Sequence, residues 1–203
     1  MNKFIIDDTE LKFLNTLEID SLNHVIASTP KNYILNGFSK VLEISKILNT
    51  KLKNKGCLLI DQNVYKIYFK NILTFTKERI YFVDALEENK NIETVLDICS
   101  FYAANNINKG SEVYVIGGGI LQDLGGSASY LYKRGIPWSY IPSTLLGISD
   151  SCLGGKTAVN FKSYKNLLGL FSAPREVILC SEFLNTLSND DLACGYGEIF
   201  RLS

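Results

Sequence analysis

Histidine is almost absent from this sequence, since His24 is the single one among 203 residues. A site that needs two histidine ligands therefore cannot be built from this chain alone. Cysteine pairs at metal-binding or redox spacing are missing too, because none of the five cysteines forms a CxxC pair. We expect free, buried thiols in a reducing, cytoplasmic location, and His24 as a surface residue.

Long apolar runs and an excess of one charge are also absent. No run of about 18 apolar residues occurs, which argues against a transmembrane helix, and the early acids of MNKFIIDDTELKF do not fit a signal peptide. Lys and Arg number 21, as do Asp and Glu, so we expect neither nucleic acid nor membrane as a partner. With 46% hydrophobic residues, the chain has the composition of a globular protein.

The hydrophobic pattern alternates between strand-like and helix-like segments. HVIAS and NYILN flank Thr29-Pro30-Lys31 and predict a hairpin, and 37–53 predicts a helix. Strands are then expected at 57–61, 79–85, 112–119 and 138–142, with helices at 63–73, 91–106 and 120–133 between them. This order predicts an α/β fold, a Rossmann-like parallel sheet flanked by helices, with an N-terminal β-hairpin.

The last third of the sequence has a different texture. From residue 143 we expect Gly- and Ser-rich loops around helical pieces. DDLACGYGEIFRLS begins like a helix, with Ser188 or Asn189 as its N-cap, and has no terminator, so we expect the chain to end inside an element.

Candidate ligand-binding residues follow three of the predicted strands. Ligands of open parallel sheets bind at the carboxyl ends of the strands. Asp61 and Asn63 follow the first strand, Glu87 and Lys90 the second, and three glycines at 117–119 the third. Glycines that open a helix favour phosphate, and Asp61 could accept ribose hydroxyls, which together suggest a dinucleotide site. A packing turn, a helix cap and a solvated ion pair remain the alternatives for these groups.

The segment 134–166 is dense in charged and hydroxyl residues among glycines. It carries Arg134, Asp150, Lys156, Lys165 and Asn166, and its cations suit phosphate or carboxylate. Its GKT sequence is no P-loop, because Asp150 stands where the motif needs glycine. We expect a site here rather than a plain surface loop.

Several stretches together resemble the sugar phosphate cyclases, most closely the 3-dehydroquinate synthases. They are GGGILQDLGG, YKRGIPWSYIPSTLLGISDSCLGGKTAVN, KNLLG and GYGEIFRL, with weaker matches at DQNV and at the Glu87–Lys90 pair. The resemblance is strong over 113–201 and looser over 57–112. It implies a two-domain enzyme in which 1–187 is the NAD-binding α/β domain. Residues 188–203 would start a helical metal and substrate domain that is otherwise absent from this chain.

The resemblance also implies roles for individual residues. The residues implied to contact NAD are Asp61, Asn63, Glu87, Lys90, Gly118, Gly119, Asp123, Ser143, Thr144, Lys165 and Thr186. The implied catalytic residues are Arg134, Asp150, Lys156, Asn166 and Arg201, with Arg134 reaching a substrate phosphate across a dimer interface. Glu198 matches the ligand of a divalent metal, zinc or cobalt, whose two histidine ligands belong to the second domain. This chain alone should therefore be inert and bind metal poorly.

The implied reaction converts 3-deoxy-D-arabino-heptulosonate 7-phosphate to 3-dehydroquinate with release of phosphate, in aromatic amino acid biosynthesis. Transient oxidation by NAD, elimination, reduction and aldol closure make up the sequence of steps. The chain departs from the family pattern at Arg201, where lysine is usual, and at Gln122 and Leu86, where glycine is usual. A valiolone-type cyclase and a non-catalytic NAD-binding module remain open as alternatives.

Overall fold

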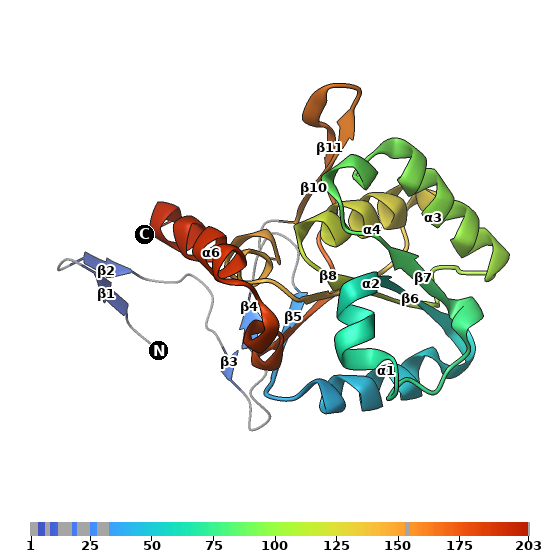
Figure 1. Ribbon diagram of the computed structural model, residues 1–203, viewed down its shortest axis with the longest axis horizontal. Coiled ribbons are helices and arrows are strands. Elements are labelled where there is room, and N and C mark those ends of the chain that lie inside the picture. Colours follow the sequence, from blue (N-terminus) through green and yellow to red (C-terminus); the bar gives the residue numbers. More distant parts are fainter. Residues whose placement is uncertain are drawn as a thin grey trace.

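The computed structural model describes residues 33–152 and 155–202, together with the short segments 4–6, 9–11, 18–19 and 25–27. An eight-stranded sheet forms the centre (Figure 1). Its strands, in spatial order, are β3 (Glu18–Ile19), β4 (Val25–Ala27), β5 (Tyr33–Phe38), β12 (Glu176–Cys180), β9 (Ser139–Pro142), β8 (Glu112–Gly117), β6 (Gly56–Asp61) and β7 (Ile80–Val83). In this order, the six strands from β5 to β7 run parallel to one another. β4 pairs antiparallel with β5, and β3 pairs antiparallel with β4.

Helices cover both faces of the sheet, as Figure 1 shows. One face carries α1 (Val41–Lys55) and α2 (Gln62–Val64), which continues into a π-helical turn at Tyr65–Phe69. The other face carries α3 (Ile92–Ala104) and α4 (Gly119–Leu131). The described parts of the chain contain no helix that is both long and apolar enough to cross a membrane.

The central strands are apolar throughout because both of their faces are buried. In β8, Val113 and Val115 belong to the core under α3 and α4, whereas Tyr114 and Ile116 belong to the core under α1. β6 divides its side chains in the same way. Alternate residues point to opposite faces, so a parallel strand covered twice reads as one continuous apolar run.

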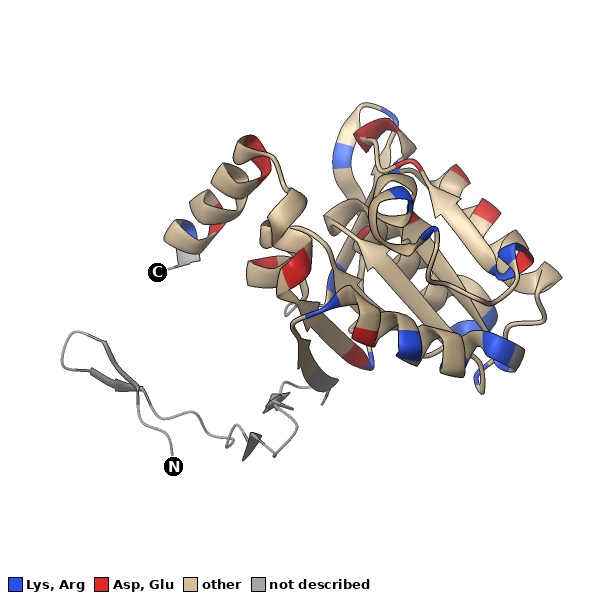
Figure 2. Ribbon diagram, turned by 60° about the horizontal axis from the view of Figure 1, so that its bottom comes forward, with Lys and Arg blue, Asp and Glu red and all other residues tan. Residues whose placement is uncertain are grey.

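Three described elements extend beyond this sandwich. A hairpin of β10 (Lys156–Phe161) and β11 (Tyr164–Phe171) projects from the α3–α4 side in Figure 1. α6 (Asn189–Leu202) follows β12 after a 3₁₀ helix, and β1 (Phe4–Ile6) pairs with β2 (Thr9–Leu11). Figure 2 shows acidic and basic residues interspersed over the described surface, in keeping with the balanced charge.

The structure confirms the predicted class and the four predicted strands, which are the neighbours β9, β8, β6 and β7. The predicted hairpin is also present, because β4 pairs with β5, although its turn at 29–31 and His24 lie outside the described residues. The helix predicted at 37–53 begins only at Val41, because the preceding residues continue β5.

In the last third, the expected helical pieces occur at Gly147–Ser151, Ser181–Thr186 and Asn189–Leu202, but the expectation was wrong for the stretch between the first two. Residues 156–180 contain β10, β11 and β12 rather than loops around helical pieces. β12 inserts between β5 and β9, a non-local pairing that the local pattern could not reveal. The predicted N-cap of the last helix is Ser188, whose Oγ accepts from the Asp191 amide at 3.1 Å, while Asp191 Oδ2 accepts from the Ser188 amide at 3.3 Å.

Candidate functional site

A crevice of about 510 Å³ lies at the carboxyl edge of the parallel sheet. β7 and β8 pair on opposite sides of β6, so the chain leaves β6 and β8 towards opposite faces. Such a switch point opens a crevice between the two connections. The strands that deliver residues to it are β6 with Asp61, β7 with Ala85, β8 with Gly118, β9 with Ser143 and, through the following 3₁₀ helix (Ser181–Thr186), β12 with Thr186.

The three glycines at the end of β8 have different roles. A Cβ on Gly117 would collide with Leu121, and one on Gly118 would come within 3.0 Å of Thr144 Cγ2, so these two serve close packing. A Cβ on Gly119 would meet nothing within 4 Å, and Gly119 lines the crevice. Gly118 is the N-cap of α4 and supplies no side-chain cap, so the first amides of the helix are left for a ligand.

Asp61 has two roles at the end of β6. Its Oδ1 accepts from the amides of Asn63 at 2.6 Å and of Val64 at 3.2 Å, so it caps α2. Its Oδ2 has no hydrogen-bond partner among the residues described. The helix-cap interpretation of Asp61 is thus correct, and a carboxylate oxygen is still available beside the crevice.

Two hydroxyl residues after β9 and one after β12 add to the polar lining, which also includes Asp191 of α6. Thr144 Oγ1 accepts from the Gly147 amide at 3.1 Å, and the Ser143 amide donates to Gly117 O at 2.9 Å, which ties the two strand ends together. Thr186 Oγ1 lies 2.7 Å from Tyr68 Oη. Sequence reasoning missed Tyr68, whose signal would have been its position one helical turn beyond Val64 on the same side of the crevice.

Seven of the eleven predicted cofactor residues line this crevice. They are Asp61, Asn63, Gly118, Gly119, Ser143, Thr144 and Thr186. The other lining residues include Val64, Ile67, Ile120, Leu146 and Leu187, which give the crevice apolar walls. The remaining four predicted cofactor residues lie outside it.

A second group of predicted residues forms around the buried ammonium of Lys90. Its Nζ lies 3.0 Å from Asp123 Oδ2, 2.6 Å from Asn166 Oδ1 and 3.8 Å from Glu87 Oε1. Asp123 Oδ1 also accepts from the Ala158 amide at 2.9 Å. Burial raises the pKa of Asp123, although the Ala158 amide and Lys90 oppose that shift. We call these four residues, Glu87, Lys90, Asp123 and Asn166, the Lys90 junction.

A third group joins α6 to the π-helical turn at Gly147–Ser151. Glu198 accepts two hydrogen bonds from Arg201 Nε, at 2.9 and 3.0 Å, and another from Nη2. The Arg201 guanidinium lowers the pKa of Glu198, and Glu198, with a smaller contribution from Asp150, raises that of Arg201. The part of the chain that the structure describes contains no group of three or more His, Cys, Asp or Glu residues able to hold a metal ion.

Three predicted residues stand apart from these groups. Lys156 and Lys165 are exposed on the β10–β11 hairpin. Arg134 is exposed near the start of β9, whereas Ser143 and Thr144 follow its end, so Arg134 lies at the opposite edge of the sheet. The structure does not bring Arg134 to the crevice of its own chain.

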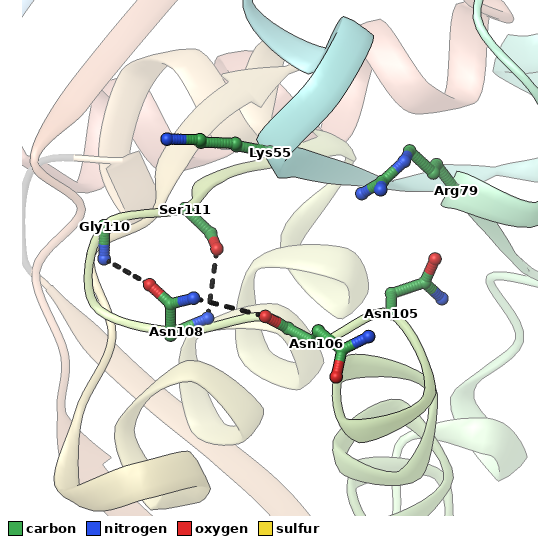
Figure 3. A pocket seen from close by; sticks show the side chains of 7 residues that line it. All are labelled: Lys55, Arg79, Asn105, Asn106, Asn108, Gly110 and Ser111. Carbon is green, nitrogen blue, oxygen red and sulfur yellow. Dashed lines mark hydrogen bonds between the residues drawn. The ribbon is translucent and has the colours of Figure 1, made fainter.

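A smaller pocket of about 280 Å³ lies at that amino edge and holds Lys55 and Arg79 (Figure 3). Both cations have a structural explanation. Lys55 is the last residue of α1, where its positive charge interacts favourably with the carbonyl end of the helix. Arg79 Nη1 donates a hydrogen bond to the carbonyl of Gly56, the first residue of β6, at 2.9 Å. Asn108 is occupied by its own turn, as the dashed lines in Figure 3 show.

The fold and the crevice together define a doubly wound α/β protein with an open crevice at the switch point of the sheet. Comparison with known proteins agrees with this class. The family model "3-dehydroquinate synthase N-terminal" matches residues 80–194. The 3-dehydroquinate synthase of Pelagibacter ubique is 38% identical over 175 residues, which are 84% of this chain and 48% of that protein. That of Clostridium tetani is 36% identical over 177 residues, 84% of this chain and 47% of that protein.

The chain therefore belongs to the 3-dehydroquinate synthase family, and it spans about half the length of these relatives. Among solved structures, 2-epi-5-epi-valiolone synthase from Streptomyces hygroscopicus, with NAD⁺ and Zn²⁺ bound, is 29% identical with a TM-score of 0.74. The match covers 86% of this chain and 50% of that one. A maleylacetate reductase from Rhizobium at 16% identity and a TM-score of 0.58, covering 81% of this chain and 45% of that one, shares the fold.

Proposed function

We propose that this chain binds NAD in the crevice, as part of a protein that converts 3-deoxy-D-arabino-heptulosonate 7-phosphate to 3-dehydroquinate and phosphate. The observation that carries the proposal is the convergence of seven predicted cofactor residues, from the ends of four strands, on one crevice. The family membership and the NAD⁺ in the valiolone synthase structure support it.

The crevice has groups suited to each part of a dinucleotide. The uncapped amides at the start of α4 suit the pyrophosphate, and the open space over Gly119 lets it approach the backbone. The free oxygen of Asp61 can accept ribose hydroxyls, and the apolar walls can hold the rings. Bound NAD would supply reversible hydride acceptance. By the resemblance, Lys156 and Asn166, together with Asp150, would lie at the nicotinamide and the sugar phosphate.

We propose Glu198 as one ligand of a divalent metal, because the 2-deoxy-scyllo-inosose synthase and valiolone synthase structures contain Co²⁺ and Zn²⁺. The carboxylates of Glu198 and Asp150 have the donor chemistry for a cation, but both Glu198 oxygens accept from Arg201, and the two residues fall short of the three protein ligands usual for zinc. The other ligands would come from outside residues 1–203. Isothermal titration of this chain with zinc should show no tight stoichiometric binding, and tight binding would contradict this assignment.

A homodimer would explain the position of Arg134. Arg134 lies at the edge of the sheet remote from the crevice of its own chain. It can therefore contact only a substrate that is bound in the crevice of a second copy. We also propose that 1–187 forms the cofactor domain and that 188–203 begins a second one, in keeping with the separate N-cap of α6 at Ser188. The five cysteines are all unpaired, which supports a reducing compartment.

The decisive experiment uses the complete protein with NAD, a divalent metal and the heptulosonate phosphate. Release of phosphate together with dehydroquinate would support the proposed reaction. Turnover of sedoheptulose 7-phosphate instead would favour a valiolone-type cyclase, which the 29% identity to that enzyme keeps open. Binding of NAD without turnover of either sugar would identify a non-catalytic binding module, and no NAD binding would refute the proposal.

A further inference from the structure

The ladder of the β10–β11 hairpin is interrupted opposite Asn160. Val159 pairs with Leu168 and Phe161 with Tyr164, so the single residue Asn160 faces three residues, 165–167. Asn166, in the middle of this bulge, has a positive φ of 55°. A non-glycine residue in this region is strained and persists only where its surroundings hold it there. Bulges of this kind redirect side chains, and this one carries Lys165 and Asn166.

Both polar groups of the Asn160 side chain, and its backbone amide, make hydrogen bonds around the bulge. Its Oδ1 accepts from the Asn166 amide at 2.9 Å, which closes the bulge. Its Nδ2 donates to Glu87 Oε1 at 2.9 Å and to Glu87 O at 3.2 Å, and its own amide donates to Lys90 O at 2.8 Å. One side chain therefore joins the bulge of β11 to the loop that follows β7.

We propose that Asn160 is a positioning residue that sets the geometry of the Lys90 junction. Through Asn160, the bulge and the Glu87–Lys90 loop form one unit, in which Asn166 Oδ1 meets Lys90 Nζ at 2.6 Å. Asn160 itself touches neither the crevice nor the Lys90 ammonium. Its consequence for catalysis rests on the function proposed above, whereas its structural role does not.

The structural arm measures hydrogen exchange in the complete protein with Asn160→Ala. Loss of the three exposed side-chain hydrogen bonds of Asn160 should speed the exchange of amides at 164–168 by about 5- to 30-fold. Amides of α1 should be unchanged. Asn108→Ala is the matched control, because Asn108 also makes side-chain bonds to Gly110 N and Asn106 O, but at the opposite edge. Unchanged exchange at 164–168 would overturn the proposal.

The second arm reverses one hydrogen bond. Asn160→Asp keeps an acceptor for the Asn166 amide but sets a second carboxylate against Glu87, so it should loosen the bulge. Adding Glu87→Gln restores a hydrogen bond between the two side chains, in which the amide at position 87 now donates to the carboxylate at position 160. The pair then has the same net charge as in the unaltered protein. Exchange at 164–168 should return towards the rate of Glu87→Gln alone, and failure of this rescue would refute the role.

The activity readout separates this proposal from the proposed function. Asn160→Ala should raise KM for the sugar phosphate more than it lowers kcat, with partial recovery in the double variant. If the unaltered protein neither binds NAD nor turns over sugar, the proposed function fails while the exchange result still decides the role of Asn160. If exchange changes but KM does not, the claim that Asn160 positions the site is refuted.

Discussion

Alanine at position 119 should separate cofactor binding from folding. Gly119 is the first residue of α4 and has helical geometry, and a Cβ there would meet no protein atom within 4 Å. Alanine is the better helix former, so the free energy of unfolding should stay the same or rise by up to about 1 kcal/mol. The added methyl group would instead stand in the crevice where the backbone approaches the pyrophosphate.

The cost of this methyl group can be bounded. Overpacking a close contact typically costs about 1–3 kcal/mol, which corresponds to a loss of NAD affinity of about 5- to 150-fold. Isothermal titration with NAD measures the affinity, and urea unfolding measures the stability of the same preparation. Gly37→Ala is the matched control, because its Cβ also meets nothing within 4 Å and Gly37 lies on β5, outside the crevice lining. Equal NAD affinity in the Gly119→Ala and Gly37→Ala proteins would refute this placement of the cofactor.

Three further predictions concern packing, thiols and pH. Gly126→Ala should lower the free energy of unfolding by about 1–3 kcal/mol in urea, because its Cβ would overlap the Thr157 methyl group. At pH 8, iodoacetamide should label the exposed Cys194 long before Cys152, because burial raises the pKa of the Cys152 thiol to about 12. NAD should slow the labelling of Cys194, because that residue lines the crevice. Mass spectrometry of the labelled protein measures both effects. Burial raises the pKa of Asp123, so the folded chain binds the carboxyl proton of Asp123 more tightly than the unfolded chain does. Stability should therefore fall as pH rises from about 4 through the raised pKa, and Asp123→Asn should remove that slope in urea unfolding measured at several pH values.

Local pattern was enough for the elements that form the core of the sheet. Each of β6, β7, β8 and β9 is a short, mainly apolar run that ends in a polar or small residue or is followed by one, and helical periodicity fills the gaps between them. The sequence did not predict β11, because nearly all of its residues are exposed and no alternation of apolar and polar residues marks it as a strand. β12 had a signal in its run EVILC, but its place between β5 and β9 depends on pairing distant in sequence.

The site was predictable to the extent that strand ends meet at one edge. Asp61 and Gly118 could be placed at one edge without knowledge of strand order, because both come at the ends of predicted parallel strands, although the same rule did not bring Glu87 and Lys90 into the crevice. The Lys90 junction could not, since it depends on a bulge and on a positive φ at Asn166 that no sequence period reveals. Arg134 precedes the predicted strand at 138–142, so the same rule would have placed it at the amino edge, away from the crevice.

The first two turns of α4 connect the two halves of the proposed site. Gly119 lines the crevice, and Asp123, four residues later on the same side of the helix, binds Lys90 and the β10 amide of Ala158. Four residues of helix span about 6 Å, so a ligand over Gly119 lies about one helical turn from the carboxylate that anchors the hairpin. A displacement of α4 by a bound pyrophosphate would therefore move Asp123, and with it Lys90 and Asn166. We therefore expect NAD to alter the exchange of amides in β10, and Gly119→Ala to lessen that effect.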